Sequence, residues 1–290
     1  MCIHRLFKEW YMKWLVLLVL AVASSVFADD RIIYAADVSG EFDHIVLQAP
    51  ITVEVQQGED YKIWVKTPPL LRDNLVLRQK GKRLYVGWKA DERWLNMVDR
   101  DSVKVKIELP SISVLEAQGS GNLYVGDMTL NNLTYNNSGS GDAYIGNLVA
   151  EKISVALQGS GDLEVISLAV SRIALASMGS SDISIGRLDT QDLNINSAGN
   201  GDITIVDQSS ADSADISLLG NGDVEAMPLH VVSANISLLG SSDIEITVNE
   251  RLNASVMGSG DIVYGGSPAS VDLNQFGSGD VRAAGEDNDS

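Results

Sequence analysis

A column of acidic residues is the feature of this sequence with the clearest chemical potential. A four-residue unit, Gly-small-Gly/Ser-Asp, recurs along the chain, and its last position is Asp in every copy except the first, where it is Asn. These positions are Asn122, Asp142, Asp162, Asp182, Asp202, Asp223, Asp243, Asp261 and Asp280. If the copies lie over one another, neighbouring carboxylates are about 4.8 Å apart. Like charges at that spacing need compensation, either by bound cations or by hydrogen bonds.

Two roles for these aspartates follow from their chemistry. In the first, each side chain caps its own turn by accepting hydrogen bonds from backbone N–H groups just beyond it. In the second, the aspartates hold Ca²⁺ between coils, because carboxylate and carbonyl oxygens are suitable ligands. One carboxylate per coil is sparse for an ion with about six to eight ligands, and the unit differs from the nonapeptide of known calcium solenoids. We therefore favour capping, with calcium as the alternative and no other cofactor.

Catalytic groups are scarce elsewhere in the chain. The histidines His4, His44 and His230 lie in dissimilar contexts, and no nucleophile motif accompanies them. Cleavage of polysaccharides would need carboxylates clustered with cations on one face. The basic residues from position 118 onward do not recur at a common phase: Lys152, Arg172, Arg187, Arg251 and Arg282. The sequence thus favours a non-enzymatic protein, and an enzyme that acts on extracellular polysaccharide is the alternative.

The same unit supplies the fold prediction. Its first glycine recurs at spacings of 18 to 21 residues. These glycines are Gly119, Gly139, Gly159, Gly179, Gly199, Gly220, Gly240, Gly258 and Gly277. Apolar residues alternate on either side of them, as Leu163 and Val165 or Leu193 and Ile195 do, which predicts short strands with one buried face. The units themselves are turns, since glycine adopts positive φ without penalty.

Turns at a constant period predict an all-β, right-handed parallel β-helix with coils of about 20 residues. Propeller blades need about 40 residues or more per repeat, and sandwiches do not keep their corners in register. A second corner recurs within the coils, as in Gly146-Asn147-Leu148 and Gly186-Arg187-Leu188. Each coil is therefore expected to hold two or more short strands.

Regularity divides the chain into parts. Residues 29–117 alternate less regularly, and we predict irregular N-terminal coils that cap the stack, with a separate packed subdomain as the alternative. Residues 118–282 form the regular solenoid, and residues 283–290 form a disordered acidic tail. Residues 89–101 interrupt the strands and are expected to be a loop.

Residues 1–28 have the layout of a secretory signal peptide. Basic residues precede an apolar run, and Val26-Phe27-Ala28 supplies a cleavage site before Asp29. The apolar run is shorter than the ~20 residues that a membrane span needs. Cleavage removes the only cysteine, Cys2, so the mature chain forms no disulfide. We expect a protein exported to the periplasm, the outer surface or the medium, in a Gram-negative bacterium, with no membrane span left after cleavage.

Charge excludes one class of partner. The formal net charge is −18, and residues 118–290, with five basic and 23 acidic residues, carry a net charge of −18 themselves. Nucleic acids and anionic lipid surfaces are bound through patches of Lys and Arg. The solenoid therefore repels them, and a protein or glycan partner is the expectation.

Three motifs in the first half of the chain carry a family resemblance. They are Ile51-Thr52-Val53-Glu54-Val55-Gln56-Gln57-Gly58, Arg83-Leu84-Tyr85-Val86-Gly87 and Val103-Lys104-Val105-Lys106-Ile107-Glu108-Leu109-Pro110. Followed by the Gly-Ser-Gly-Asp units, they resemble the bacterial family called putative auto-transporter adhesin, head GIN domain, over about residues 42–281. The resemblance implies an exported β-helical domain and brings no catalytic residues with it. We expect an adhesin-like scaffold, with a purely structural periplasmic protein as a further alternative beside the enzyme.

Overall fold

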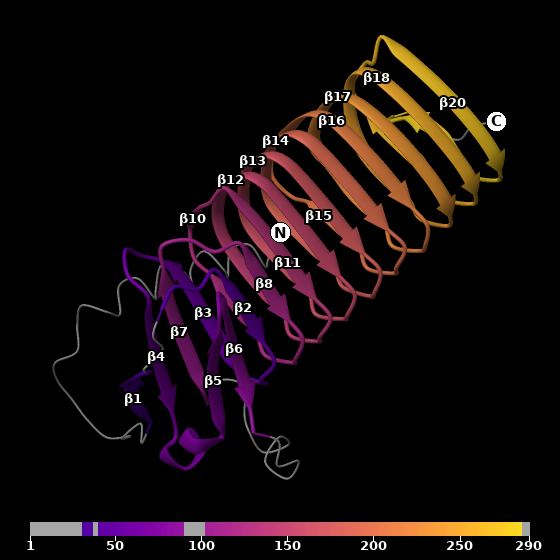
Figure 1. Ribbon diagram of the computed structural model, residues 1–290. Helices are drawn as coiled ribbons and strands as arrows, with labels where there is room; N and C mark the ends of the chain where they lie inside the picture. Colours follow the sequence, from indigo (N-terminus) through magenta and orange to yellow (C-terminus); the bar gives the residue numbers. More distant parts are fainter. Residues whose placement is uncertain (1–30, 37–39, 90–101, 286–290) are drawn as a thin grey trace, which may run out of the picture. The chain divides into compact units, whose positions relative to one another are not determined.

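The computed structural model describes residues 31–36, 40–89 and 102–285 (Figure 1). The predicted signal peptide, all but the first residue of the predicted loop and residues 286–290 of the predicted tail lie outside the described residues. Within these ranges the chain is all-β apart from one short 3-10 helix. No helix of the described part is long and apolar enough to cross a bilayer.

The described chain forms a β-solenoid of about eight turns with coils of about 20 residues, as predicted (Figure 1). Strands β8 to β21 make up its regular part. They are β8 Val114–Ala117, β9 Leu123–Val125, β10 Met128–Thr129, β11 Asn132–Asn137, β12 Ala143–Leu157, β13 Leu163–Ser177, β14 Ile183–Ser197, β15 Ile203–Ile205, β16 Ser209–Leu218, β17 Val224–Gly240, β18 Ile244–Gly258, β19 Ile262–Gly265, β20 Ser270–Gly277 and β21 Val281–Ala283.

Successive coils pair in parallel at matching positions of the repeat. Leu163 of β13 lies opposite Ile183 of β14, and Ile173 lies opposite Leu193. Every second side chain points inward, so Ile, Leu and Val of successive coils stack on one another and are buried between β12 and β18. The core is therefore continuous from coil to coil, and no single coil could bury it alone.

The strands are longer than the sequence predicted. The expected second corners, Gly146-Asn147-Leu148 and Gly186-Arg187-Leu188, lie inside the continuous strands β12 and β14. Pairing between β12 and β13 resumes at Asn147 directly after Gly146, so the chain bends there without leaving its neighbour. The expected corners are therefore bends within continuous strands, because the pairing between coils is kept on both sides of each bend.

The corner glycines are needed for a reason other than the predicted one. Of the nine, all within the described residues, only Gly240, Gly258 and Gly277 have positive φ. A Cβ on Gly159 would lie 1.8 Å from the carbonyl oxygen of Gly139 in the coil before. Real Cβ atoms never come so close to another atom, so glycine permits the close approach of one corner to the next.

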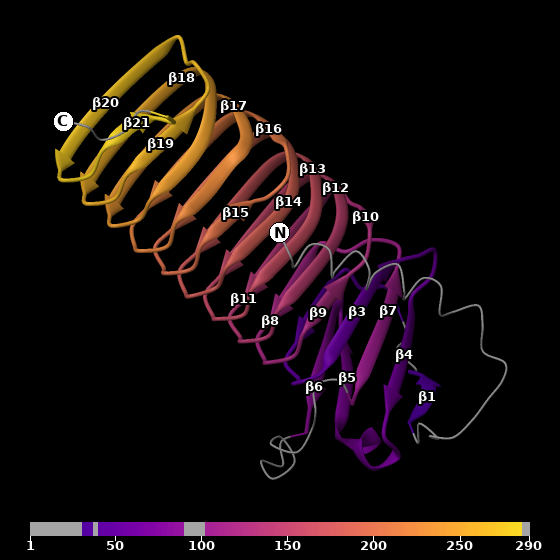
Figure 2. The same ribbon diagram turned by 180° about the vertical axis from the view of Figure 1, so that it is seen from behind.

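The first strands are joined to the same sheet, but in a different spatial order. They are β1 Ile32–Ala35, β2 His44–Leu47, β3 Thr52–Gln57, β4 Lys62–Thr67, β5 Leu75–Lys80, β6 Arg83–Trp88 and β7 Lys104–Leu109, with helix η1 at Pro69–Asn74. Strand β2 pairs in parallel with β6 on one side and β8 on the other. Strand β3 pairs likewise with β7 and β9 (Figure 2). The coil of β2 and β3 is thus inserted between two coils that follow it in the sequence.

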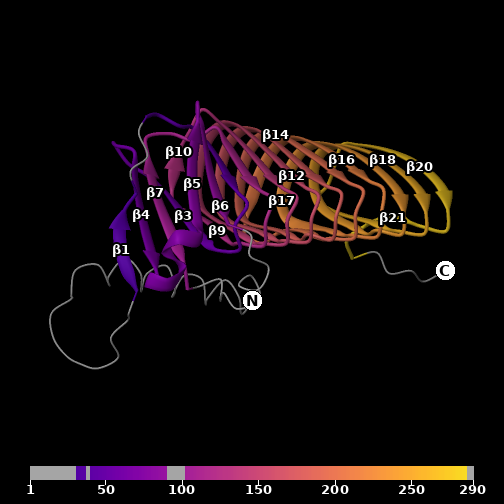
Figure 3. The ribbon, with the colours of Figure 1, turned by 60° about the horizontal axis from the view of Figure 1, so that its bottom comes forward.

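Antiparallel strands finish this end of the stack. Strand β4 runs antiparallel to β7, β1 runs antiparallel to β4, and β5 runs antiparallel to β6. Figure 3 shows β1 and β4 at the opposite end of the stack from β20 and β21. Antiparallel strands cannot continue the parallel stack of the solenoid.

Candidate interaction face

Three columns of outward side chains run along the solenoid axis, over the part of each coil that precedes the glycine corner. The amide column consists of Asn194, Asp215, Asn235, Asn253 and Asp272. The serine column consists of Asn196, Ser217, Ser237, Ser255 and Asn274. The apolar column, two residues farther along each coil, consists of Met178, Ala198, Leu219, Leu239, Met257 and Phe276. Strands β14, β16, β17, β18 and β20 carry most of these residues side by side (Figure 1).

The amide and serine columns line an open groove with a volume of about 430 Å³. Its lining residues come from five successive coils, and their side chains are short. Besides the members of these two columns, the backbone of Ile216, Ile236 and Ala254 forms its floor. Short side chains over a flat sheet leave room along the axis, so the groove can accept an extended partner that runs across the coils.

Hydrogen bonds fix the amide column in place. The Asn253 side chain donates from Nδ2 to Oδ1 of Asn235 at 2.8 Å, and Asn235 donates to Oδ1 of Asp215 at 2.8 Å. Asn196 donates to Asn194 at the far end of the groove. Because each amide is held by its neighbour, these groups lose little rotamer freedom when a partner binds.

The charge of the face changes along the axis. The side chains that line the groove include the carboxylates of Asp215 and Asp272 and no Lys or Arg. A second hollow of about 250 Å³ begins two coils earlier, shares Asn194 and Asp215 with the groove, and is lined by Lys152, Arg172 and Asp192 among others. Arg172 pairs with Glu151 at 3.4 Å, so part of its charge is already compensated. The groove itself therefore disfavours anionic partners and suits neutral or basic ones.

The apolar column is unusually exposed. Its five large side chains are between 43% and 64% exposed, although they lie in register on neighbouring coils. Single exposed apolar residues are ordinary on protein surfaces, but a contiguous row marks an interaction site more often. The row borders the serine column, so polar and apolar groups are available to one partner at the same time.

The predicted aspartate column exists, but its hydrogen bonds differ from those predicted. Each side chain of the column from Asn122 to Asp261 accepts the backbone N–H of the next Asp in the stack instead of a donor in its own turn. Asp182 N donates to Oδ1 of Asp162 at 3.0 Å, and Asp202 N donates to Oδ1 of Asp182 at 2.9 Å. The other contacts of this kind, from Asn122 to Asp280, are 2.7 to 3.1 Å long. The side chains thus link coils rather than cap turns.

The aspartates do not gather around a common point. Among the described residues, no group of three or more His, Cys, Asp or Glu side chains is placed to hold a metal ion. The bonds to backbone N–H groups supply the stabilisation that like charges in a column need. Calcium between the coils stays an untested prediction.

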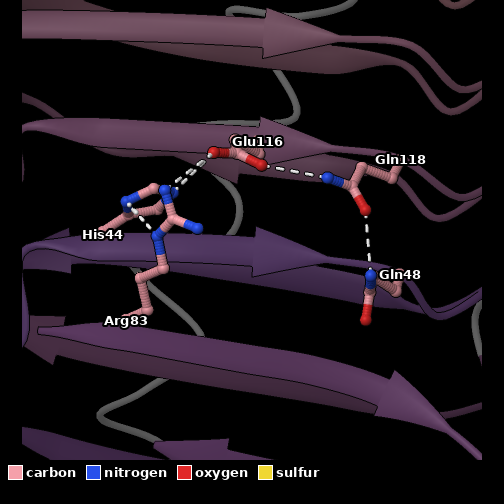
Figure 4. Close-up of polar contacts among 5 residues, drawn as sticks. All are labelled: His44, Gln48, Arg83, Glu116 and Gln118. Carbon is pink, nitrogen blue, oxygen red and sulfur yellow. Dashed lines mark hydrogen bonds and ion pairs between the residues drawn. The ribbon is translucent and has the colours of Figure 1, made fainter. Parts of the chain in front are cut away.

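A polar network on β2, β6 and β8 joins three adjacent strands (Figure 4). Arg83 Nε donates to Nδ1 of His44 at 3.1 Å, and His44 Nε2 lies 2.8 Å from Oε1 of Glu116. Since a guanidinium nitrogen only donates, Nδ1 is the acceptor and the proton of the neutral ring is on Nε2. Gln118 donates to Glu116 at 2.9 Å, and Gln48 donates to Gln118 at 2.9 Å. Both ring nitrogens of His44 are therefore held by contacts to neighbouring strands.

A family model agrees with these features. The model described as "putative auto-transporter adhesin, head GIN domain" matches residues 41–213 and, in a second overlapping match, residues 172–268. The chain belongs to this family. The matched residues of this head GIN chain include the inserted coil of β2 and β3 and most of the interaction face.

Solved structures share the fold of the head GIN chain. A putative lipid binding protein from Parabacteroides distasonis ATCC 8503 matches with a TM-score of 0.66 and 20% identity, over 88% of this chain and 97% of that chain. A putative adhesin from Parabacteroides merdae ATCC 43184 matches with a TM-score of 0.60 and 21% identity, over 88% and 96%. A putative adhesin from P. distasonis ATCC 8503 has a TM-score of 0.61 and 20% identity, over 88% and 97%. No curated protein matches the chain.

Sequence reasoning identified the corners of this head GIN chain and missed the interaction face. A signal was present: the pairs Asp215/Ser217, Asn235/Ser237, Asn253/Ser255 and Asp272/Asn274 recur at the period of the corners. They alternate with the inward residues that were used to predict strands. The sequence predicts a polar surface for a partner but does not single out these residues, because alternation alone does not tell a binding face from a solvated one.

Proposed function

We propose that this chain is an exported, adhesin-like, non-catalytic binding protein of the bacterial envelope. Its partner is a protein or glycan in the periplasm or at the cell surface. The binding surface is the interaction face: the groove formed by the amide and serine columns, with the apolar column beside it. The rest of the solenoid acts as a rigid support that holds this face in a fixed shape.

One observation carries the proposal: pre-ordered polar groups and an exposed apolar row share one face over five coils. Rigid groups reduce the entropic cost of binding, and apolar side chains supply the desolvation energy that polar contacts alone do not. Membership of an adhesin family supports the same function. So does the acidic solenoid, which excludes nucleic acid and anionic lipid as partners.

A binding assay with two matched double variants tests the proposal. The full chain is labelled and titrated onto outer-membrane vesicles of a Gram-negative bacterium and onto a panel of neutral and acidic polysaccharides. We expect saturable binding to one of these probes. Leu239→Ser with Met257→Ser removes the centre of the apolar column and should weaken that binding by about tenfold or more.

The control variant changes the same two strands on another part of the coil. Glu225→Ser with Glu245→Ser alters an exposed stacked pair on β17 and β18 that is outside the groove. It should leave binding within about twofold, since exposed residues outside an interface contribute little. Equal loss in both double variants, or no saturable binding to any probe, would contradict the proposal.

Export and the enzymatic alternative are tested separately. Fractionation of the native host should recover a chain that begins at Asp29 in the envelope or the medium, and a chain that retains residues 1–28 would refute cleavage. Incubation with the same polysaccharides should release no reducing ends. Release that is abolished by replacing one defined carboxylate would establish an enzyme instead.

A further inference from the structure

Among the described strands, β20 has no neighbour on its outer side. Strand β20 pairs with β18 alone, and β21 pairs with β19 alone, among the described strands. Figure 1 shows β20 at the extreme end of the stack, with all the other coils on one side of it. All eight residues of β20 are exposed, whereas the strands before it are half buried.

The exposed side chains of β20 include members of the core columns. Val271 is 40% exposed, while Leu252, its partner in β18, is completely buried. Leu273 is 38% exposed, and its partner Ala254 is 3% exposed. The apolar interior therefore continues to the end of the stack and is open there.

The free backbone groups of β20 belong to these same inward residues. In the regular coils, outward residues donate to the coil before, as Ala198 N does to Ser177 O and Leu219 N does to Ser197 O, at 2.8 and 2.7 Å. The accepting residues are inward ones, so inward residues face the coil that follows. Gln275 occupies the column of Ser197. By the alternation of the strand, Val271, Leu273 and Gln275 direct their N–H and C=O groups to the open edge.

The opposite end of the solenoid cannot fill this edge. It is closed by the antiparallel strands β1, β4 and β5, and β5 carries Arg78 and Lys80 along its length. A parallel coil cannot add to it in the register of the stack, and edge charges oppose strand pairing. Head-to-tail stacking of copies into a filament is thereby disfavoured, which leaves the two β20 ends to meet each other.

We propose that a second copy of this chain covers the open end, by antiparallel pairing of β20 with β20 around a two-fold axis at Leu273. In this register Leu273 lies opposite Leu273 of the second copy, and Val271 lies opposite Gln275 of the second copy. All of these are inward residues with free backbone groups, so each pair exchanges two N–H···O bonds. The interface is the same patch on both copies, and it closes as a dimer.

Charge selects this register over its neighbours. A shift of the axis to Asp272 would place two carboxylates directly opposite each other, which is destabilising. A shift to Asn274 would place Asp272 opposite Phe276. With the axis at Leu273, Asp272 lies opposite Asn274 of the second copy, and an amide can donate to a carboxylate. Residues 286–290, Glu-Asp-Asn-Asp-Ser, are a poor alternative cover because they contain no apolar side chain.

The dimer has a consequence for the interaction face. Asp272 ends the amide column, and Asn274 ends the serine column. Their pairing across the axis joins the groove of one copy to the groove of the other, in reverse direction. A long partner could then contact both copies, and the second contact would be intramolecular and so strengthen binding. The association itself does not depend on which partner the face binds.

Sedimentation velocity and a cysteine scan test the dimer. In a Cys2→Ser background, which has no other cysteine, we expect a monomer–dimer equilibrium that shifts toward dimer with concentration and with salt, because added salt screens the repulsion between two acidic copies. Leu273→Cys should form a disulfide-linked dimer on mild oxidation. Residues in a hydrogen-bonded antiparallel pair have Cα atoms about 5.5 Å apart, which is within the range of disulfides. Asp272→Cys should form much less disulfide-linked dimer, since the residue opposite position 272 is Asn274.

Leu273→Lys supplies the disruptive variant, and Val149→Lys, at an exposed apolar residue of β12 outside the interface, is the matched control. Two lysines facing each other at the axis should raise the dissociation constant by about tenfold or more, whereas Val149→Lys should change it by less than about threefold. Circular dichroism checks that both variants fold, which is expected because both sites are exposed in the monomer. Monomer at every concentration overturns the proposal, as do larger assemblies with no dimer. Stronger cross-linking at residue 272 than at residue 273 overturns the register.

Discussion

The regular coils and the N-terminal coils are stacked by different means. In the regular coils, each contact is repeated at the period of the sequence: a glycine corner against the corner before it, and a carboxylate on the N–H of the next Asp. In the N-terminal coils, parallel pairing is supplemented by side-chain contacts that do not recur at the period of the sequence. Phe42 packs on Tyr61 with ring centroids 5.2 Å apart, and Arg72 lies over the ring of Tyr34 at 4.8 Å.

The two regions meet different structural requirements: one extends the stack and the other ends it. A repeating corner allows a stack of any length, but it leaves an open edge at the end, as at β20. Ending the stack needs a non-repeating structure, and the N-terminal region supplies it through antiparallel strands and an inserted coil. The two regions should therefore respond differently to the same kind of change.

A buried leucine in each region gives the largest expected effect. Leu84 of β6 and Leu193 of β14 are both almost completely buried, and truncation of each to Ala should cost about 3 kcal/mol or more of unfolding free energy. Amide hydrogen exchange should distinguish the two variants. Leu193→Ala should expose the amides of adjacent coils first, because solenoid coils contact only their neighbours. Leu84→Ala should loosen β2, β6 and β8 together, and the same local pattern in both variants would remove the distinction.

A corner glycine gives the next largest effect. A Cβ on Gly159 would meet a backbone oxygen at 1.8 Å, and the coils on both sides limit relaxation. Gly159→Ala should therefore cost about 2–3 kcal/mol, as overpacking does in other cores. Gly126→Ala is the matched control, because its nearest atoms would be 3.6 Å away. Similar denaturation midpoints for the two variants would show that the corner is less crowded than the geometry implies.

The aspartate column should respond more weakly, and according to its hydrogen bonds. Asp182→Ala leaves Asp202 N–H without its acceptor and should cost about 1–2 kcal/mol. Asp182→Asn keeps an acceptor at the same place, as Asn122 does for Asp142, and should be close to the wild type. Thermal melting measures both.

Calcium chelation completes this measurement. Since the backbone bonds alone account for the column, chelation should leave the melting temperature of the wild type unchanged. A fall of the melting temperature on chelation, restored by added calcium, would favour the calcium alternative of the sequence analysis. The same treatment of Asp182→Asn would then tell whether that carboxylate is a ligand.

The sequence predicts those features of the fold that follow from the repeat period of about 20 residues. Gly119 to Gly277 and Asp142 to Asp280 recur often enough to fix parallel stacking, and the structure bears this out. The sequence could not predict the inserted coil. Val53 pairs with both Val105 and Leu123, and no repeat period links its segment to theirs. Nor could the sequence tell whether an Asp bonds its own turn or the next coil. A one-dimensional repeat describes both arrangements equally well.

The interaction face illustrates the same limit. Asn235 and Asn253 were visible as polar residues at the outward phase, but a hydrogen bond between them requires that the coils be superposed first. The apolar column could not be predicted for a different reason. Leu219, Leu239 and Met257 directly follow inward Leu or Val residues, so they broke the alternation and read as the end of a strand.

The smallest expected effect comes from the tyrosine pair of the first two regular coils. Tyr124 of β9 stacks on Tyr144 of β12, with ring centroids 4.9 Å apart and an interplanar angle of 13°. Burial, with a smaller contribution from Asp142, raises the pKa of Tyr144 to about 12. A phenol whose pKa is higher in the folded than in the unfolded state gives its full contribution to stability when the pH is below its ordinary pKa near 10. That contribution to stability is lost as the pH rises to about 12.

Tyr144→Phe keeps the stacked ring and removes the ionisation. At pH 8 the variant and the wild type should have closely similar melting temperatures. Between pH 10 and about 12 the wild type should lose more stability than the variant, by less than about 1 kcal/mol because the ring is partly exposed to solvent. Melting at both pH values, with phenolate absorbance to follow the titration, measures the difference. Equal losses in the variant and the wild type would contradict the prediction, because Tyr144 would then not contribute to the pH dependence of stability.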